Sequence, residues 1–327
     1  ESIDKRVIAG KVNTSLKYGE NPQQKAIYIS KPFLKVKKDE FTLIKGEKLS
    51  FNNFIDITAA YKILSELNSY RKPACTIIKH SNPCGVAISE TPFFAYSRAL
   101  NSDPVSAFGG IVGINRKVDV SLARKISKTF TEILLAPDFT LGALEIFSKK
   151  KKIKVLKIRN FDGKLINKED FKSVIGGNLI QTTDTISSNS NSFEIVTKLK
   201  PSKFELEDLL FLWKIVKHVK SNAIVIGKNL HIGGVGAGQA NRVRSVEIAI
   251  KQNNEFSKEN KKLDTELSLG LASDAFFPFP DSLEIAAKNG IFNIIQPGGS
   301  KKDEEIIETA NRLNQKMIFT KVRHFIH

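Results

Sequence analysis

Lys79 and His80 are the residues of this sequence whose types and order best suit acid–base chemistry. They end an apolar run at 74–79 and precede the breaker segment 82–85 (Asn-Pro-Cys-Gly), so a cationic pair stands at a turn after an expected buried strand. Proteins of the α/β class place ligands outside strand ends of this kind, and an imidazole can accept a proton near neutral pH. Taken alone, the segment also fits a strand-end histidine bonded to a backbone carbonyl, and that alternative stays open here.

The spacing around His80 does not fit a catalytic zinc site. Base deaminases combine His-x-Glu with Pro-Cys-x-x-Cys, but Pro83-Cys84 has no second cysteine at that spacing and no Glu follows His80. Zinc needs about four ligands, or three and a water. We therefore expect no catalytic metal.

Three further segments have compositions that suit a ligand. Residues 233–239 (Gly-Gly-Val-Gly-Ala-Gly-Gln) read as a glycine-dense loop before a helix, either an anion cradle or a plain tight turn. Residues 273–281 combine three Phe with two Pro and end on Asp281, which fits an aromatic shelf for a flat heterocycle such as a pterin, or core packing. Residues 296–300 place Ser300 before an expected helix, as an N-cap or a ligand donor.

The elements that position these residues alternate between short apolar runs and amphipathic stretches, which indicates an α/β fold. We expect strands at 74–79, 86–88, 111–114, 292–295 and 317–319, and helices at 92–100, 120–135, 281–288 and 303–313. A polar tract at 187–192 marks the expected boundary between two domains, 1–190 and 191–327. Residues 79–82 (Lys-His-Ser-Asn) and 219–222 (Val-Lys-Ser-Asn) both precede apolar runs, a weak echo that duplication or chance would produce.

Composition narrows the class of protein. A chain of 327 residues is long for one compact domain and natural for two. The net charge of +17 attracts anions: nucleic acid, acidic membrane, or small substrates with phosphates and carboxylates. Two cysteines, Cys75 and Cys84, favour a reducing cytoplasm, and no apolar stretch approaches the roughly 20 residues of a membrane span.

Seven segments, taken in order, resemble AICAR transformylase, the formyl-transferring region of the bifunctional purine-biosynthesis enzymes. They are 16–24, 79–85, 102–110, 236–243, 273–279, 296–300 and 319–327. The resemblance implies two tandem cytidine-deaminase-like α/β units without zinc. It also implies transfer of the formyl group of 10-formyltetrahydrofolate to the 5-amino group of aminoimidazole carboxamide ribotide (AICAR), without a covalent enzyme intermediate, late in purine synthesis. The resemblance further implies a homodimer with its active site at the interface.

The resemblance also assigns residues. Lys79 and His80 match the catalytic pair, in which His80 accepts the proton of the 5-amine while Lys79 stabilises the oxyanion and helps the folate N10 leave. The positions that match ribotide contacts are Lys17, Tyr18, His80, Gly109, Glu132, Asn222, Arg242, Phe276 and Arg323. The positions that match folate contacts are Val243, Asp281, Ser300 and Lys301. Among these, the two arginines suit a phosphate and polar ring substituents, and Asp281 suits the pterin.

The sequence departs from the family pattern at Lys17, where the family has Arg, at Gln23, where it has His, and at Lys321, where it has Gly. Lys keeps the charge but loses the bidentate fork, which puts the shape of the phosphate contact at Lys17 in doubt. The chain begins at Glu1 rather than Met and has nothing that matches the family's cyclohydrolase domain. A trimmed protein and a stand-alone transformylase both fit that observation, and the residues leave a monovalent cation site undecided.

Two other classes of function compete with the transformylase. A basic nucleotide- or RNA-binding protein without catalysis would suit the charge of +17. It would need a basic face interleaved with exposed aromatic residues, whereas the aromatic residues here cluster in apolar segments. An inactive dimeric scaffold would keep the fold and the interface without turnover. Titration of the protein with ribotide and 10-formylfolate, followed together with the formation of tetrahydrofolate, separates all three.

Overall fold

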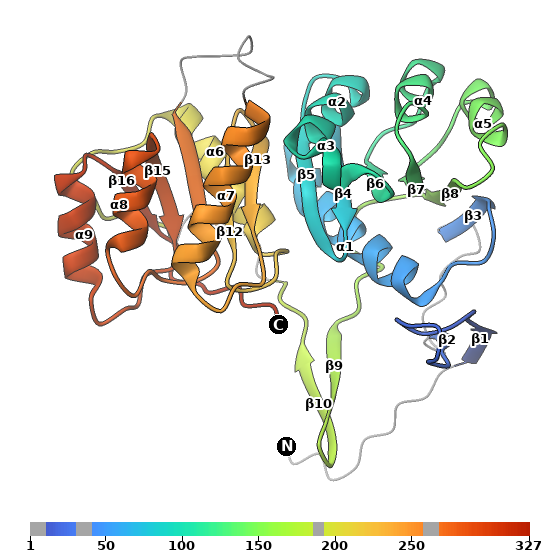
Figure 1. The fold of residues 1–327 in the computed structure, drawn as a ribbon, viewed down its shortest axis with the longest axis horizontal. Helices are drawn as coiled ribbons and strands as arrows, with labels where there is room; N and C mark the ends of the chain where they lie inside the picture. Colours follow the sequence, from blue (N-terminus) through green and yellow to red (C-terminus); the bar gives the residue numbers. More distant parts are fainter. Residues whose placement is uncertain (1–10, 31–40, 186–192, 258–267) are drawn as a thin grey trace.

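The computed structural model describes residues 11–30, 41–185, 193–257 and 268–327. The expected domain boundary at 187–192 lies outside the described residues. Within them, the chain forms a mixed sheet of twelve strands with helices on both faces (Figure 1), which confirms the α/β class. In the described part of the chain, no helix is long and apolar enough to span a membrane.

Two successive stretches build this sheet, and we call them the first unit and the second unit. The first unit contains α1 (Phe51–Leu67), β4 (Ala74–Lys79), β5 (Asn82–Ile88), α2 (Pro92–Ser102), α3 (Pro104–Ala107), β6 (Gly110–Ile114), α4 (Val120–Ile126), β7 (Thr131–Ala136), α5 (Leu141–Ser148) and β8 (Lys154–Ile158). The second unit contains α6 (Lys203–Val216), β12 (Ile224–Lys228), β13 (His231–Gly236), α7 (Arg242–Ser257), β14 (Leu269–Ser273), α8 (Asp281–Lys288), β15 (Ile291–Gln296), α9 (Asp303–Arg312) and β16 (Lys316–Phe319).

The remaining strands lie at the margins. Two of them extend the sheet at its two edges: β3 (Phe41–Lys45) and β11 (Glu194–Ile195). The others form separate two-stranded sheets, which are β1 (Lys11–Ser15) with β2 (Ile27–Ser30) and β9 (Glu169–Val174) with β10 (Gly177–Thr182). The β9–β10 hairpin projects away from the body of the molecule (Figure 1).

The two units repeat one topology. The strand order is β5-β4-β6-β7-β8 in the first unit and β13-β12-β14-β15-β16 in the second. Strands β5 and β13 lie side by side and join the two halves, with Ala87 paired to His231 and Ile88 N–H donating to the Leu230 carbonyl at 2.9 Å. A single sheet therefore runs through both units.

Corresponding residues repeat as well. Helix α1 begins with a capping box at Ser50, and α6 begins with one at Ser202. Six residues after each cap, Asp56 and Asp208 accept hydrogen bonds from the backbone of a hairpin turn, β4–β5 and β12–β13 respectively. By position, residues 79–82 therefore correspond to residues 228–231. The expected correspondence between 79–82 and 219–222 is wrong.

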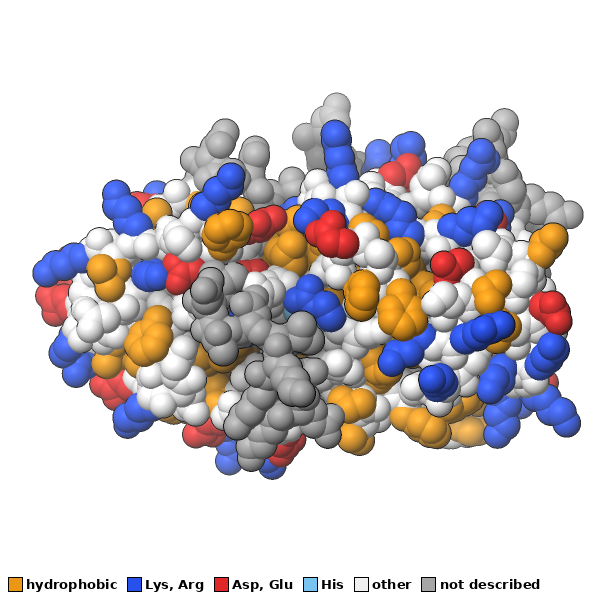
Figure 2. Space-filling view, turned by 90° about the horizontal axis from the view of Figure 1, so that it is seen from above, with side chains coloured by type: hydrophobic (Ala, Val, Ile, Leu, Met, Phe, Trp, Pro, Cys, Tyr) orange, Lys and Arg blue, Asp and Glu red, His pale blue; other side chains and the backbone are white. Residues whose placement is uncertain are grey.

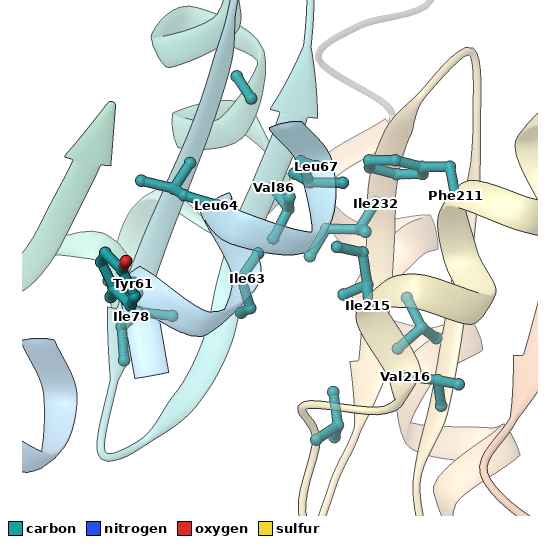
Figure 3. Close-up of a cluster of buried hydrophobic side chains, with 14 of the residues drawn as sticks. Tyr61, Ile63, Leu64, Leu67, Ile78, Val86, Phe211, Ile215, Val216 and Ile232 are labelled. Carbon is teal, nitrogen blue, oxygen red and sulfur yellow. The ribbon is translucent and has the colours of Figure 1, made fainter. Parts of the chain in front are cut away.

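The helices form two layers, one on each face of the sheet. Helices α1 and α6 cover one face, and their apolar side chains form one cluster with the strands of both units. Figure 3 shows this cluster where Leu67 of α1 and Ile215 of α6 approach Val86 and Ile232 of the two central strands. A fully buried aliphatic side chain contributes about 1.5–3 kcal/mol, so this shared core binds the units together. On the other face α2, α4 and α5 cover the first unit and α7, α8 and α9 the second.

Two expected elements are wrong. The expected helix 120–135 is in fact α4, which ends at Ile126, followed by β7. Residues 133–136 are fully buried between β6 and β8, and a short apolar run of this kind has no period that separates a strand from a helix. The expected breaker 82–85 lies inside β5, because the turn contains only residues 80–81 and Pro83 faces a register shift in β4.

Candidate active site

The turn between β4 and β5 presents His80 to solvent. His80 and Ser81 have φ angles of 50° and 66°, which matches the two-residue hairpin turn in which both central residues are left-handed. The Asp56 carboxylate of α1 accepts the Ser81 N–H at 2.7 Å and holds the turn. Burial raises the pKa of Asp56, while the hydrogen bonds from Ser81 and the nearby His80 oppose that rise. Local backbone geometry therefore fixes where His80 stands.

The Lys79 ammonium is held by a backbone platform. Lys79 Nζ donates to the Phe108 carbonyl at 2.9 Å, and Gly109 N–H, on the other side of the same peptide group, donates to the Phe130 carbonyl at 2.7 Å. Gly109 has a φ of +69°, and a Cβ there would lie 3.2 Å from Lys79 Nζ and 3.3 Å from the Phe130 ring. The structure thus brings together Lys79, His80 and Gly109 and explains the glycine.

A cavity of about 520 Å³ lies beside this turn, between the two units. Its volume is within the range of small-molecule sites. The lining combines the Lys79–His80 end of the first unit with β13 and α7 of the second. The lining residues are Lys79, His80, Asn82, Pro83, Cys84, Asp103, Ser106, Val235, Ala237, Ile248, Lys251, Gln252 and Glu255. Lys79 and His80 are the predicted site residues among them.

Other predicted ribotide residues surround the start of α1. Asn52 Nδ2 donates to the Glu20 carbonyl at 3.2 Å, which ties the segment containing Lys17 and Tyr18 to this helix. The Lys17 ammonium lies 6.0 Å from the centre of the Tyr18 ring. Glu132, a third ribotide candidate here, accepts a 2.8 Å hydrogen bond from Asn53 Nδ2 and pairs with Lys154 at 3.5 Å. None of Lys17, Tyr18 and Glu132 lines the cavity.

In the second unit, Arg242 is directed inward. Its side chain is 7% exposed and pairs with Asp274, which is fully buried. Arg242 Nη1 also donates to Ser273 Oγ at 2.8 Å and Nη2 to Asn222 Oδ1 at 2.7 Å. The predicted pair Asn222 and Arg242 is thus in direct contact, and the guanidinium is surrounded by protein groups.

The C-terminal segment is tied to the same region. His324 N–H donates to the Asp274 carbonyl at 3.0 Å, and Ser221 N–H donates to the Ile326 carbonyl at 2.9 Å. Arg323 remains exposed, with its guanidinium 4.5 Å above the Phe325 ring. Phe276, the aromatic ribotide candidate of this region, is half-buried two residues after Asp274. Arg323 therefore offers an exposed guanidinium next to a backbone segment that hydrogen bonds hold in place.

The predicted folate residues lie around the first turns of α7, α8 and α9. Asp281 is the first residue of α8 and accepts the Ser282 N–H at 2.7 Å. Ser300 Oγ accepts the Lys302 N–H at 3.1 Å just before α9, while Val243 is half-buried in α7 and Lys301 is exposed. The expected aromatic shelf has one exposed ring: Phe279 is 52% exposed and lies 4.5 Å below the Lys302 ammonium. None of these folate candidates lines the cavity.

The glycine-dense segment 233–239 is not the expected loop. Residues 233–236 belong to β13, where a Cβ at Gly234 or Gly236 would lie 2.0 Å from a backbone carbonyl of α7. These glycines therefore let α7 pack closely on the strand. Of the glycines in the segment, Gly238, with a φ of +68°, lies in the loop itself.

The structure adds residues that the sequence did not single out. Asp56 accepts from the turn that carries His80, Asp103 caps the short helix α3 that precedes Phe108, and Gln252 donates to Asp103. Asp103 lies in the matched segment 102–110, which was the available signal, whereas Gln252 lies on a helix outside every matched segment. Across the described ranges, no three His, Cys, Asp or Glu side chains gather to hold a metal ion.

Comparison with known proteins places this geometry in context. The sequence model of a family described as "AICARFT/IMPCHase bienzyme" matches residues 2–252. A bifunctional purine biosynthesis protein PurH of Persephonella marina is 48% identical over 316 residues, covering 96% of this chain and 59% of the relative. PurH proteins of a Thermoanaerobacter species and of Bacillus cereus are 47% and 44% identical, with 58% and 62% of their lengths covered. The chain thus spans about three fifths of the length of these curated relatives.

Proposed function

The chain belongs to the AICARFT/IMPCHase bienzyme family, and from that membership we propose that it transfers the formyl group of 10-formyltetrahydrofolate to the 5-amino group of AICAR. The products are formyl-AICAR and tetrahydrofolate, in the late steps of purine biosynthesis. The observation that carries the proposal is the Lys79–His80 pair on its left-handed turn, beside a cavity of about 520 Å³. This pair supplies a base and a fixed cation within one turn of backbone.

The proposed reaction forms one bond and breaks one. The 5-amino nitrogen attacks the formyl carbon, and the exposed imidazole of His80 takes the proton that the amine loses. The Lys79 ammonium, anchored on the Phe108 carbonyl, stabilises the oxyanion that forms on the formyl oxygen. The bond from the formyl carbon to folate N10 then breaks, and N10 receives a proton. No enzyme nucleophile is needed.

Binding roles follow from exposure. Arg323 and Lys17 are exposed cations that suit the ribotide phosphate. Asn222 is held by Arg242 at its Oδ1 and by the Gln239 carbonyl at its Nδ2, and the second lone pair of its oxygen is proposed to accept from a ring substituent. Arg242, which is enclosed by Asn222, Ser273 and Asp274, is proposed to hold Asn222 in place rather than to contact phosphate. Asp281 is proposed as the pterin acceptor.

We further propose a homodimer in which the active site combines both copies. Its support is that the cavity beside Lys79 and His80 is lined by none of Asn222, Phe276 or Arg323 of the same copy. The two units, with their repeated topology, are proposed to be cytidine-deaminase-like and zinc-free, with the domain boundary near residue 190. The two buried, unpaired cysteines suit a cytoplasmic location.

The competing RNA-binding interpretation is less well supported by the surface. On the face seen in Figure 2, Lys and Arg side chains are scattered among hydrophobic and uncharged ones instead of forming one stripe. A strand-tracking nucleic-acid site needs a continuous basic groove with stacking aromatic residues. The charge of +17 is as well explained by attraction of anionic substrates.

The test is turnover of AICAR and 10-formyltetrahydrofolate, followed as tetrahydrofolate formation. His80→Asn is the sharpest variant, because Asn tolerates the left-handed backbone that an alanine would strain. We expect it to lose at least two orders of magnitude in kcat while still binding AICAR. The matched control is the reciprocal change Asn229→His in the corresponding turn of the second unit, where φ is 54°. Normal turnover by His80→Asn would overturn the assignment.

Mixing two inactive variants tests the shared site. His80→Asn and Arg323→Met proteins are each expected to be impaired alone, and unfolding and refolding them together should restore up to about a quarter of the sites if a site takes one residue from each copy. Full activity of a monomer at assay concentration would contradict the proposed dimer.

A further inference from the structure

We propose that Asp103 and Gln252 form a positioning pair through which the second unit sets the place of the Lys79 ammonium. The inference rests on the proposed formyl transfer, and it adds two residues that the matched segments do not assign a role. Both side chains line the cavity beside Lys79. Neither is placed against the reacting atoms, so both act through Lys79.

The first link is the cap of α3. Asp103 is 8% exposed, and its Oδ1 accepts the Ser106 N–H at 2.8 Å at the start of this four-residue helix. Helix α3 ends at Ala107, and the next residue, Phe108, supplies the carbonyl that accepts from Lys79 Nζ. The orientation of the Asp103 carboxylate therefore fixes the short helix that presents the lysine's acceptor.

The second link crosses between the units. Gln252 of α7 donates from Nε2 to Asp103 Oδ2 at 2.8 Å, and its Oε1 accepts the Val235 N–H of β13 at 2.7 Å. The two contacts assign the orientation of the amide. If the Gln252 amide were flipped, its NH2 group would face the Val235 N–H and its oxygen would face the Asp103 carboxylate, and neither pair could form a hydrogen bond. The amide thus connects β13 to the cap of α3.

The third link is electrostatic. Asp103 and Lys79 line the same cavity, so an Asp103 carboxylate that is no longer bonded to Gln252 can turn toward the Lys79 ammonium. An ammonium paired with a neighbouring carboxylate stabilises an oxyanion less well, because its charge is already compensated. Gln252 keeps Oδ2 occupied by a neutral donor and leaves the lysine's charge available.

A reciprocal exchange tests the pair. Asp103→Asn places two amide donors opposite one another, and Gln252→Glu places two carboxylates opposite one another. In the double variant Asp103→Asn/Gln252→Glu, the Asn amide donates to the Glu carboxylate, which still accepts from Val235 N–H, and the Asn oxygen still caps Ser106. All three hydrogen bonds are therefore rebuilt, and only the one between the two side chains has its direction reversed.

We expect each single variant to lose roughly 10- to 100-fold in kcat with KM for AICAR changed less than about threefold, as for a displaced catalytic group. The double variant should recover kcat to within about fivefold of the wild type. Glu247→Gln, on the same helix with an exposed side chain that does not line the cavity, is the control and should keep normal kcat. Gln252→Met removes both hydrogen bonds without adding charge and should match the single variants.

The outcomes separate the two proposals. A folded wild-type protein that forms no tetrahydrofolate refutes the proposed function. An active wild type with single variants of normal kcat refutes the positioning pair. The positioning pair is also refuted if the single variants are inactive and the double variant is no more active than they are. The loss would then not come from the hydrogen bond between residues 103 and 252, which the double variant restores.

Discussion

Arg242 and Arg323 offer a direct test of which arginine holds the structure and which contacts substrate. Arg242→Met removes a guanidinium that is 7% exposed from an Asp274 carboxylate that is fully buried. The carboxylate keeps the Ser221 hydroxyl, which donates at 2.6 Å, but loses its only described cation partner. Breaking a buried ion pair in this way costs about 3–5 kcal/mol in the free energy of unfolding.

Urea unfolding measures this loss, with the fluorescence of Trp213 as the signal. Trp213 is the chain's one tryptophan, is 2% exposed and lies 5.0 Å from the His324 ring, so it reports on the core and the C-terminal segment together. The double variant Arg242→Met/Asp274→Asn removes the stranded charge while keeping an oxygen for the Ser221 hydroxyl. It should be more stable than the Arg242→Met single variant.

Arg323→Met is the counterpart, because this side chain is exposed. We expect its free energy of unfolding to stay within about 0.5 kcal/mol of the wild type. Its Kd for AICAR should rise roughly 10- to 100-fold, because a hydrogen bond to a charged group contributes about 1.5–3 kcal/mol. An Arg242→Met protein of wild-type stability with weakened AICAR binding would refute the reasoning and make Arg242 the phosphate ligand.

Three further outcomes are expected. Gly85→Ala should destabilise the protein by several kcal/mol, because its Cβ would lie 2.0 Å from the Ala99 carbonyl, whereas Gly177→Ala meets nothing within 4 Å and should leave the melting temperature nearly unchanged. Burial lowers the pKa of His231 to about 3, so below the ordinary histidine pKa of about 6.5 the unfolded state binds a proton that the folded state does not. The free energy of unfolding should therefore be unaffected by this group above pH 6.5 and fall by up to about 1.4 kcal/mol per pH unit below it. His231→Gln should remove this contribution to the slope. Burial raises the pKa of Cys84 to about 12, so iodoacetamide at about pH 8 should label this thiol in urea and leave it unlabelled in the folded protein, and rapid native labelling would contradict its burial.

The sequence by itself determined the features that depend on neighbours along the chain. Apolar runs broken at short intervals predicted the α/β class, and the run 74–79 placed Lys79 and His80 at a strand end, as the structure has them. Hydrophobic periodicity is a local signal, so it succeeds where an element's own residues decide its state. It failed at 120–135, where the buried β7 has no alternation to reveal that it is a strand.

Tertiary structure alone decided which distant residues meet. Gln252 contacts Asp103 across 149 positions, and the glycines at 234 and 236 are explained by the helix that packs on them. The same holds for Arg242: its charge suggested a phosphate ligand, and the fold gives it the buried partner Asp274, which no sequence spacing indicated. The type of a side chain limits the bonds that it can form, but the tertiary structure determines its partner. Sheet order and helix packing bring together residues that no spacing in the sequence relates.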